Sequence, residues 1–126
     1  MMKSRPKPKI MLIEDDPDLC ESWQEIFDLL GYEHCSFQRG LKAIGDRDAV
    51  ENCNLAITDY YLPDINGVEV IKRLREARPG LKAIVLTGSR EHSVVNSVKQ
   101  LEECELLHKP LNIETLEAAV AKILDL

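Results

Sequence analysis

Short apolar runs alternate five times with segments of helical periodicity along this chain, and this alternation restricts the available folds more than any other feature. Residues 10–13, 55–58 and 83–86 are apolar or β-branched throughout, and each run is bounded by polar residues. Such runs are typical of strands buried on both faces of a parallel sheet. The segments between them repeat apolar residues at three- and four-residue spacing, which indicates amphipathic helices. The pattern therefore predicts βα units around a parallel sheet.

The same pattern sets approximate limits for each element. Strands are expected at residues 10–13, 32–37, 55–58, 83–86 and 105–107. Helices are expected at residues 19–30, around 41–44, and at 68–74, 94–101 and 113–124. Gly31 is placed to cap the first helix. The predicted fold is a single-domain, doubly wound α/β fold with a five-stranded parallel sheet and five helices.

Length and charge narrow the classes of function. A chain of 126 residues fits one domain, expected at 9–126, behind a basic, flexible leader at 1–8. Four of the sixteen basic residues fall in the first nine positions, and the rest of the chain holds 22 acidic residues. An acidic body of this kind repels nucleic-acid phosphates, so we expect no direct nucleic-acid binding by this domain.

Membrane and secretory signals are not evident in the sequence. No apolar run approaches the roughly 20 residues that span a bilayer, so no membrane association is expected. The four cysteines lie far apart and include no Cys-x-x-Cys pair, which indicates free thiols in a reducing compartment. We therefore expect a cytoplasmic protein.

Polar side chains gather where the predicted strands end. Glu14 and Asp15 follow the first strand, Asp59 the third, Thr87 the fourth and Lys109 the fifth. The carboxyl ends of parallel strands meet at one edge of the sheet, where functional groups of doubly wound folds collect. These five side chains are therefore expected to form one site.

The chemistry of that site follows from its residue types. Clustered carboxylates repel one another unless a cation intervenes, and Mg²⁺ takes one or two protein carboxylates while leaving positions for phosphate oxygens. A carboxylate can attack phosphorus when a metal and a fixed cation screen its charge. We predict that Asp59 is the nucleophile, that Lys109 supplies the fixed charge and that the Thr87 hydroxyl holds a phosphoryl oxygen.

The ordered set of an acidic pair, D-x-x-x-P-x-x-x-G, Thr and Lys-Pro resembles the receiver domain of two-component response regulators over about residues 9 to 125. The resemblance implies a flavodoxin-like sheet in strand order 2-1-3-4-5. It implies an acidic pair of Glu14 and Asp15 and a phosphoacceptor at Asp59. Glu14, Asp15, Asp59 and the backbone carbonyl of Tyr61 are then the implied Mg²⁺ site, in which Asp15, Asp59 and the Tyr61 carbonyl are direct ligands. Lys109–Pro110 is a candidate cis peptide bond.

The family also implies partners and a mode of action. A receiver takes its phosphoryl group from a histidine kinase or a histidine phosphotransfer protein, and it catalyses only its own phosphorylation and slow dephosphorylation. Phosphorylation is expected to alter the face formed by the fourth helix, fifth strand and fifth helix, where a downstream effector binds.

Several residues depart from the family pattern or allow a structural role. Leu106 stands where an aromatic residue is common, so the usual movement of that ring cannot report on Thr87. Tyr61, two positions after Asp59, either influences phosphoryl hydrolysis or packs on its loop as a half-exposed ring. Asp16 is expected to be only a neighbour of the site, and Asp18 to interact with the free amides at the start of the first helix.

Three alternatives remain open at this stage. A Mg²⁺-dependent phosphohydrolase with an aspartyl nucleophile uses similar groups, but usually has a D-x-D after the first strand. A flavin-binding module is disfavoured because acidic residues stand where phosphate-binding ones are needed. The third is a purely structural ion pair between Lys109 and Asp59, which leaves the cost of the remaining carboxylates unexplained.

Overall fold

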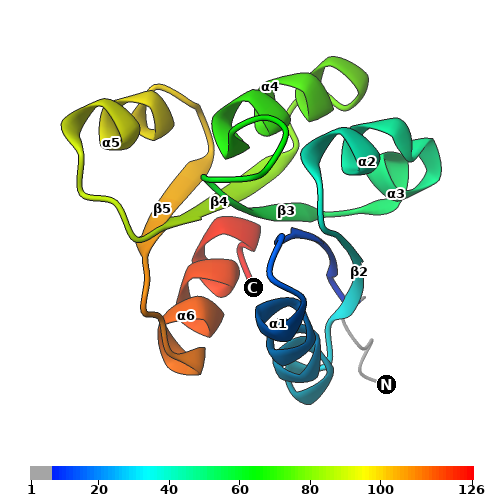
Figure 1. Ribbon diagram of the computed structural model, residues 1–126. Helices are drawn as coiled ribbons and strands as arrows, with labels where there is room; N and C mark the ends of the chain where they lie inside the picture. The colour runs from blue at the N-terminus through cyan, green and yellow to red at the C-terminus, as the bar shows by residue number, and fades with distance from the viewer. Residues whose placement is uncertain (1–6) are drawn as a thin grey trace.

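The computed structural model describes residues 7–126, so the predicted leader lies largely outside the described residues (Figure 1). The strands are β1 (Lys9–Ile13), β2 (Glu33–Phe37), β3 (Leu55–Asp59), β4 (Lys82–Thr87) and β5 (Cys104–His108). The helices are α1 (Pro17–Leu30), α2 (Gly40–Gly45), α3 (Arg47–Asn52), α4 (Gly67–Ala77), α5 (His92–Lys99) and α6 (Ile113–Leu124). None of these helices has the length and apolar character needed to cross a membrane.

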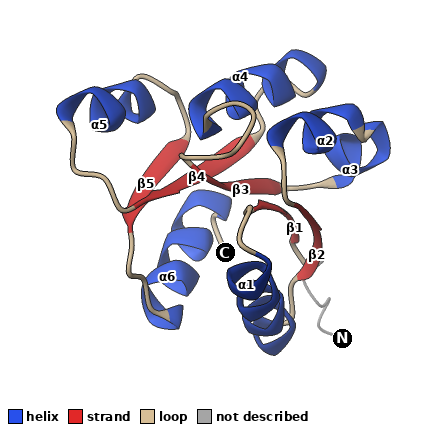
Figure 2. Cartoon of the chain, in the orientation of Figure 1, coloured by secondary structure: helices blue, strands red, loops and turns tan. Residues whose placement is uncertain are grey.

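The five strands form one parallel sheet in the order β2-β1-β3-β4-β5, which confirms the predicted topology. Helices α1 and α6 cover one face, and α2 to α5 cover the other (Figure 2). Both faces are covered because successive residues of each buried strand point to opposite sides. Ile10 and Leu12 pack in the cluster under α1 and α6, whereas Met11 and Ile13 pack in the cluster under α4.

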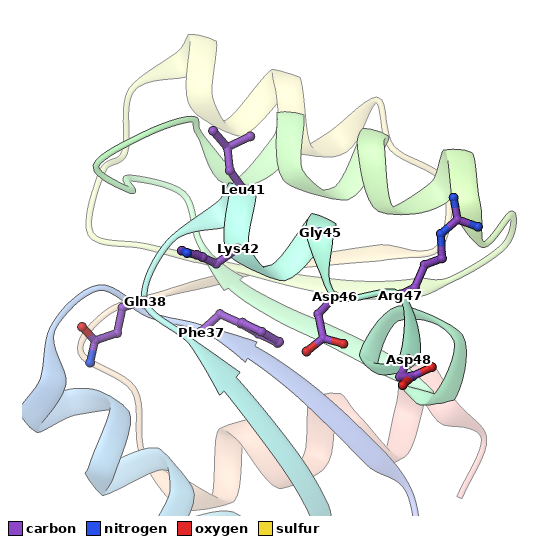
Figure 3. A pocket seen from close by; sticks show the side chains of 8 residues that line it. All are labelled: Phe37, Gln38, Leu41, Lys42, Gly45, Asp46, Arg47 and Asp48. Atoms are coloured by element: carbon purple, nitrogen blue, oxygen red, sulfur yellow. The ribbon is translucent and has the colours of Figure 1, made fainter.

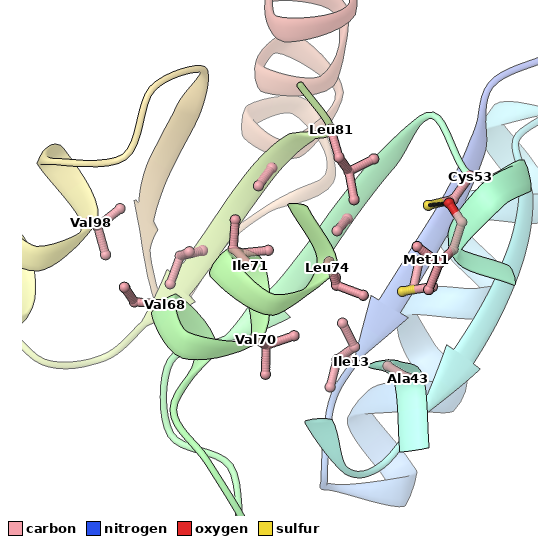
Figure 4. Packing of buried hydrophobic residues seen from close by; sticks show 14 residues of the cluster. Met11, Ile13, Ala43, Cys53, Val68, Val70, Ile71, Leu74, Leu81 and Val98 are labelled. Atoms are coloured by element: carbon pink, nitrogen blue, oxygen red, sulfur yellow. Dashed lines mark hydrogen bonds between the residues drawn. The ribbon is translucent and has the colours of Figure 1, made fainter. Parts of the chain in front are cut away.

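Helix α4 fills the centre of the second face. Its buried residues Val70, Ile71 and Leu74 lie over the sheet and reach toward Met11 and Ile13 of β1 (Figure 4). This cluster contains only apolar side chains and a buried thiol, so it specifies the position of α4 by packing. The rigid sheet and α4 together hold the loop that follows β3.

The prediction of five helices is wrong in one place, because the segment between β2 and β3 contains two short helices. Helix α2 ends at Gly45, and Asp46 adopts an extended conformation with φ −93° and ψ 90°. The Asp46 carboxylate then accepts a hydrogen bond from the Ala49 N–H at 3.1 Å and caps α3. An N-cap residue has non-helical backbone angles, so Asp46 separates two helices where the spacing of apolar residues alone predicts one.

Helix α1 begins at a cap that differs from the expected one. Asp16, taken from the sequence as only a neighbour of the site, is the N-cap and accepts hydrogen bonds from Asp18 N at 2.9 Å and Leu19 N at 3.4 Å. Asp18 lies in the first turn, where its charge favours the helix dipole. Gly31 caps the other end in the left-handed conformation at φ 79°, which confirms that prediction.

Candidate functional site

The carboxyl ends of the strands bring the predicted site residues together at one edge of the sheet. Glu14 follows β1 directly, and Asp59 and Thr87 are the last residues of β3 and β4. Lys109 follows β5, and its backbone N–H donates to the Thr87 carbonyl at 2.9 Å. Each of these positions is set by strand register, so the rigid sheet positions the side chains.

Three carboxylates form the acidic part of the site. Each of Glu14, Asp15 and Asp59 offers a carboxylate oxygen, and these oxygens lie within 4.8 Å of one another. Glu14 is 1% exposed and Asp59 is 8% exposed, whereas Asp15 faces solvent. The arrangement combines buried negative charge with one open side, as a hard cation with oxygen ligands requires.

Lys109 provides the positive charge within the cluster. Its Nζ lies 2.7 Å from Asp59 Oδ1 and 3.4 Å from Glu14 Oε2. Burial by itself lowers the pKa of Lys109, but the hydrogen bond and charge of Asp59 and the charge of Glu14 outweigh it and raise the pKa. Lys109 is therefore a permanent cation beside the Asp59 carboxylate.

Glu14 carries the unbalanced part of the negative charge. Burial, a hydrogen bond to Asp59 and the Asp59 charge raise its pKa to about 8, although Lys109 acts in the opposite direction. One lysine therefore does not neutralise both buried carboxylates. A purely structural ion pair of Lys109 with Asp59 leaves this cost unexplained.

Removing the central cation is expected to lower stability. Lys109→Met leaves the Glu14 and Asp59 carboxylates facing each other, so the free energy of unfolding should fall by about 2 kcal/mol, less than for a fully buried pair because Lys109 is 26% exposed. Lys122→Met is the matched control, since its pair with Glu105 is at the surface and should contribute no more than about 0.5 kcal/mol.

Urea denaturation measures both values. Adding Asp59→Asn to Lys109→Met should recover part of the lost stability, because it removes one of the two unscreened charges. Equal effects of the Lys109 and Lys122 substitutions would show that Lys109 does not offset a repulsion between the Glu14 and Asp59 carboxylates.

Thr87 presents a buried hydroxyl beside the charged groups. The residue is 1% exposed, and its Oγ1 accepts a hydrogen bond from the Ser89 N–H at 3.0 Å. The hydroxyl proton of Thr87 is not used in this hydrogen bond, so a phosphoryl oxygen can accept it once the side chain turns toward Asp59. Thr87 therefore lies where the sequence predicts it, at the end of β4.

The loop after Asp59 is held close to the site by a glycine. Gly67 N–H donates to the Tyr60 carbonyl at 2.7 Å. A Cβ at Gly67 would lie 2.4 Å from the Asp59 backbone oxygen, so only glycine allows this approach. Tyr61 is 55% exposed and its ring meets that of Tyr60 edge-on, with 4.9 Å between centroids.

The Lys109–Pro110 peptide bond is cis, as the family resemblance implies. A surface hollow lies elsewhere, between the end of β2 and α2–α3 (Figure 3). Phe37, Leu41 and Asp46 are among its lining residues, and none of the predicted site residues lines it. The charged cluster is therefore the stronger candidate for chemistry than the hollow.

Asp64 forms a connection that the sequence interpretation missed. Within its own turn, the Asp64 carboxylate accepts the Ile65 N–H at 3.0 Å. The carboxylate also accepts the N–H groups of Gly40 at 3.1 Å and Leu41 at 2.8 Å, at the start of α2. Burial raises the pKa of Asp64, but these backbone donors bind the charged form and bring the pKa below its ordinary value of 3.8.

Asp64→Ala is expected to lower the free energy of unfolding by about 1 kcal/mol, as for the loss of an N-cap. Because the pKa of Asp64 is lowered by folding, its stabilisation is present above the unfolded pKa and is lost as pH falls through the folded one. The difference from wild type should therefore shrink below pH 3.8. Thermal unfolding at several pH values measures this, with Glu76→Ala on the exposed surface of α4 as the control. A difference that does not change with pH would contradict the charge-assisted cap.

Comparisons with known proteins agree with the fold. Residues 10–121 match the family model described as the response regulator receiver domain. Transcriptional regulatory protein CrdR of Helicobacter pylori is 32% identical over 116 residues, which cover 90% of this chain and 54% of CrdR. Sporulation initiation phosphotransferase F of Bacillus subtilis is 27% identical over 118 residues, which cover 94% of both chains. The chain thus spans about half of the first relative and nearly all of the second.

Solved structures share the same architecture. The signal receiver domain of an HD domain-containing protein from Pseudomonas fluorescens Pf-5 has a TM-score of 0.86 at 21% identity, covering 99% of this chain and 92% of that one. A CheY-like response regulator receiver domain protein from Methanospirillum hungatei JF-1 has a TM-score of 0.84 at 27% identity, covering 95% of both chains.

Proposed function

This chain belongs to the response regulator receiver domain family of two-component signalling, and from that premise we propose that Asp59 is its phosphoacceptor and that Mg²⁺ binds the acidic cluster. The observation that carries the proposal is the position of the Asp59 carboxylate, 2.7 Å from Lys109 Nζ and among the oxygens of Glu14 and Asp15. A nucleophile, a fixed cation and an acidic cluster for a metal thereby occupy one sheet edge.

The residues suit Mg²⁺ by their chemistry. Oxygen ligands alone, two of them buried and one facing solvent, match the preference of this hard cation. Asp15, Asp59 and the Tyr61 backbone carbonyl would hold the ion, with Glu14 adjusting the charge of the cluster. When bound, Mg²⁺ supplies positive charge for the transferring phosphoryl oxygens.

The proposed reaction is one transfer in line with the leaving group. An Asp59 carboxylate oxygen forms a bond to phosphorus while the bond from phosphorus to the donor breaks, and the leaving group departs with the electron pair. Lys109 stays charged because of Asp59 and Glu14, so it stabilises the phosphoryl oxygens throughout. The Thr87 hydroxyl donates to one of those oxygens after transfer.

The donors and targets follow from the family. Receiver domains take phosphate from histidine kinases, and we assign that role to a histidine kinase or a histidine phosphotransfer protein here. The phosphorylated form would change the face around α5, β5 and α6, which takes the effector. The chain acts as a switch that transfers once and hydrolyses slowly, and its four free thiols suit the cytoplasm.

Intact mass spectrometry tests the proposal directly. Incubation with acetyl phosphate and Mg²⁺ should add one phosphoryl group, and a chelator should prevent the addition. Released inorganic phosphate should rise only slowly after the adduct has formed. Rapid, continuous release of phosphate without a stable adduct would instead favour the phosphohydrolase alternative.

A further inference from the structure

His108, the last residue of β5, has a polar atom that the proposed chemistry does not use. Its Nε2 is buried and makes no hydrogen bond within the described part of the chain. An unpartnered buried nitrogen costs about 1–3 kcal/mol, so such atoms call for an explanation. Trp23 Nε1 is the other buried side-chain nitrogen without a partner among the described residues, and it lies on α1, on the opposite face of the sheet.

The location of His108 relates that atom to the site. His108 is the register partner of Thr87 across β4 and β5, and side chains of parallel register partners lie on the same face. Leu106 and Cys104 of β5 pack in the cluster beneath α4 and α5, so His108 belongs to that face also. Helix α5, an element of the proposed output face, packs against β5, the strand that carries His108 beside Thr87.

The Thr87 hydroxyl already has a hydrogen-bond partner, which it must give up in its proposed role. Its Oγ1 accepts the Ser89 N–H at 3.0 Å. If the Thr87 side chain rotated toward a phosphoryl group on Asp59, its Oγ1 would no longer accept the Ser89 N–H. The Ser89 N–H then needs a new acceptor, because an unpaired donor in this half-buried loop is costly.

We propose that His108 is the residue that couples Thr87 to α5, with Nε2 accepting the Ser89 N–H when the Thr87 hydroxyl turns to the phosphoryl group. The inference rests on the proposed phosphorylation of Asp59. Two hydrogen bonds exist after the exchange where one existed before, so the exchange stabilises the phosphorylated arrangement. Leu106 lacks any polar atom, so His108 is the residue on this face of β5 that can make the bond. The bond draws Ser89, two residues before the N-cap Glu91 of α5, toward β5.

Nitrogen NMR of the imidazole rings tests this exchange in the intact chain. After intact mass has established the adduct, phosphorylation or the phosphoryl mimic beryllofluoride with Mg²⁺ should shift the His108 Nε2 signal from that of a free to that of a hydrogen-bonded acceptor. The Ser89 amide signal should move with it. The His34 ring, on β2 at the opposite edge of the sheet, serves as the internal control and should not change.

Substitutions separate this positioning role from a structural one. His108→Phe keeps the ring volume without an acceptor, so it should form the adduct to the same extent as wild type while losing the amide changes in α5. His108→Gln restores an acceptor and should restore those changes, and His92→Phe should behave as wild type.

The possible results are distinct. An adduct with unchanged His108 Nε2 and Ser89 signals would overturn the role of His108 and leave the phosphoacceptor proposal intact. If phosphorylated His108→Phe showed the same amide changes in α5 as the phosphorylated wild type, the role of His108 would also be overturned. A folded chain that neither forms the adduct nor responds to beryllofluoride would overturn both proposals.

Discussion

Asp59→Asn is expected to take up no phosphoryl group from acetyl phosphate under conditions that modify the wild type completely. The amide has nearly the shape of the carboxylate but is a far weaker nucleophile, and it removes one charge from the acidic cluster. The rate of phosphorylation should fall by at least about 10³-fold. Intact mass after a time course with Mg²⁺ measures the effect.

Asp16→Asn is the matched control for this experiment. Asp16 lies next to the acidic cluster but serves as the exposed N-cap of α1, and asparagine caps helices as well as aspartate does. The control should form the adduct as wild type does. A full adduct on Asp59→Asn would place the acceptor on another carboxylate, Glu14 or Asp15, and the proposal would be wrong. Circular dichroism of both variants establishes that each is folded.

Gly67→Ala is expected both to lower the free energy of unfolding and to slow phosphorylation, because of the single Cβ atom that it adds. The new Cβ would lie 2.4 Å from the Asp59 backbone oxygen and 3.1 Å from Thr58 Cγ2. The backbone oxygen belongs to the buried strand β3 and cannot move aside cheaply, so the loop must shift. Overpacking of this kind costs about 1–3 kcal/mol of unfolding free energy. The displaced loop carries Tyr61, whose carbonyl is a proposed metal ligand, so phosphorylation should slow as well.

Gly45→Ala provides the comparison with open space. A Cβ there meets nothing within 4 Å, and alanine favours a helix more than glycine does, so stability should not fall. Urea denaturation and the rate of adduct formation measure both variants. If Gly67→Ala matched Gly45→Ala in stability and rate, the close approach to Asp59 would not constrain the loop.

The order of the elements and the positions of the predicted site residues follow from the sequence alone. Buried parallel strands read as continuous apolar runs, and the residue after each run must lie at the carboxyl edge of the sheet. Asp59, Thr87 and Lys109 are predictable for that reason, since a strand has a period of two residues and a definite end. The sequence predicts β2 and the segment after it less closely, because a half-exposed edge strand and two short helices bury little apolar surface.

The remaining features depend on contacts between residues that are distant in the chain. The sequence does not show that Asp64 caps α2 from 23 and 24 residues away, or that Gly67 meets the Asp59 carbonyl. Nor does it show that the Asp16 carboxylate turns to cap α1. Periodicity and strand ends are local properties that the sequence determines by itself. Hydrogen-bond partners and the burial of His108 Nε2 are decided by the tertiary structure, because register and packing select among side chains of equal local chemistry.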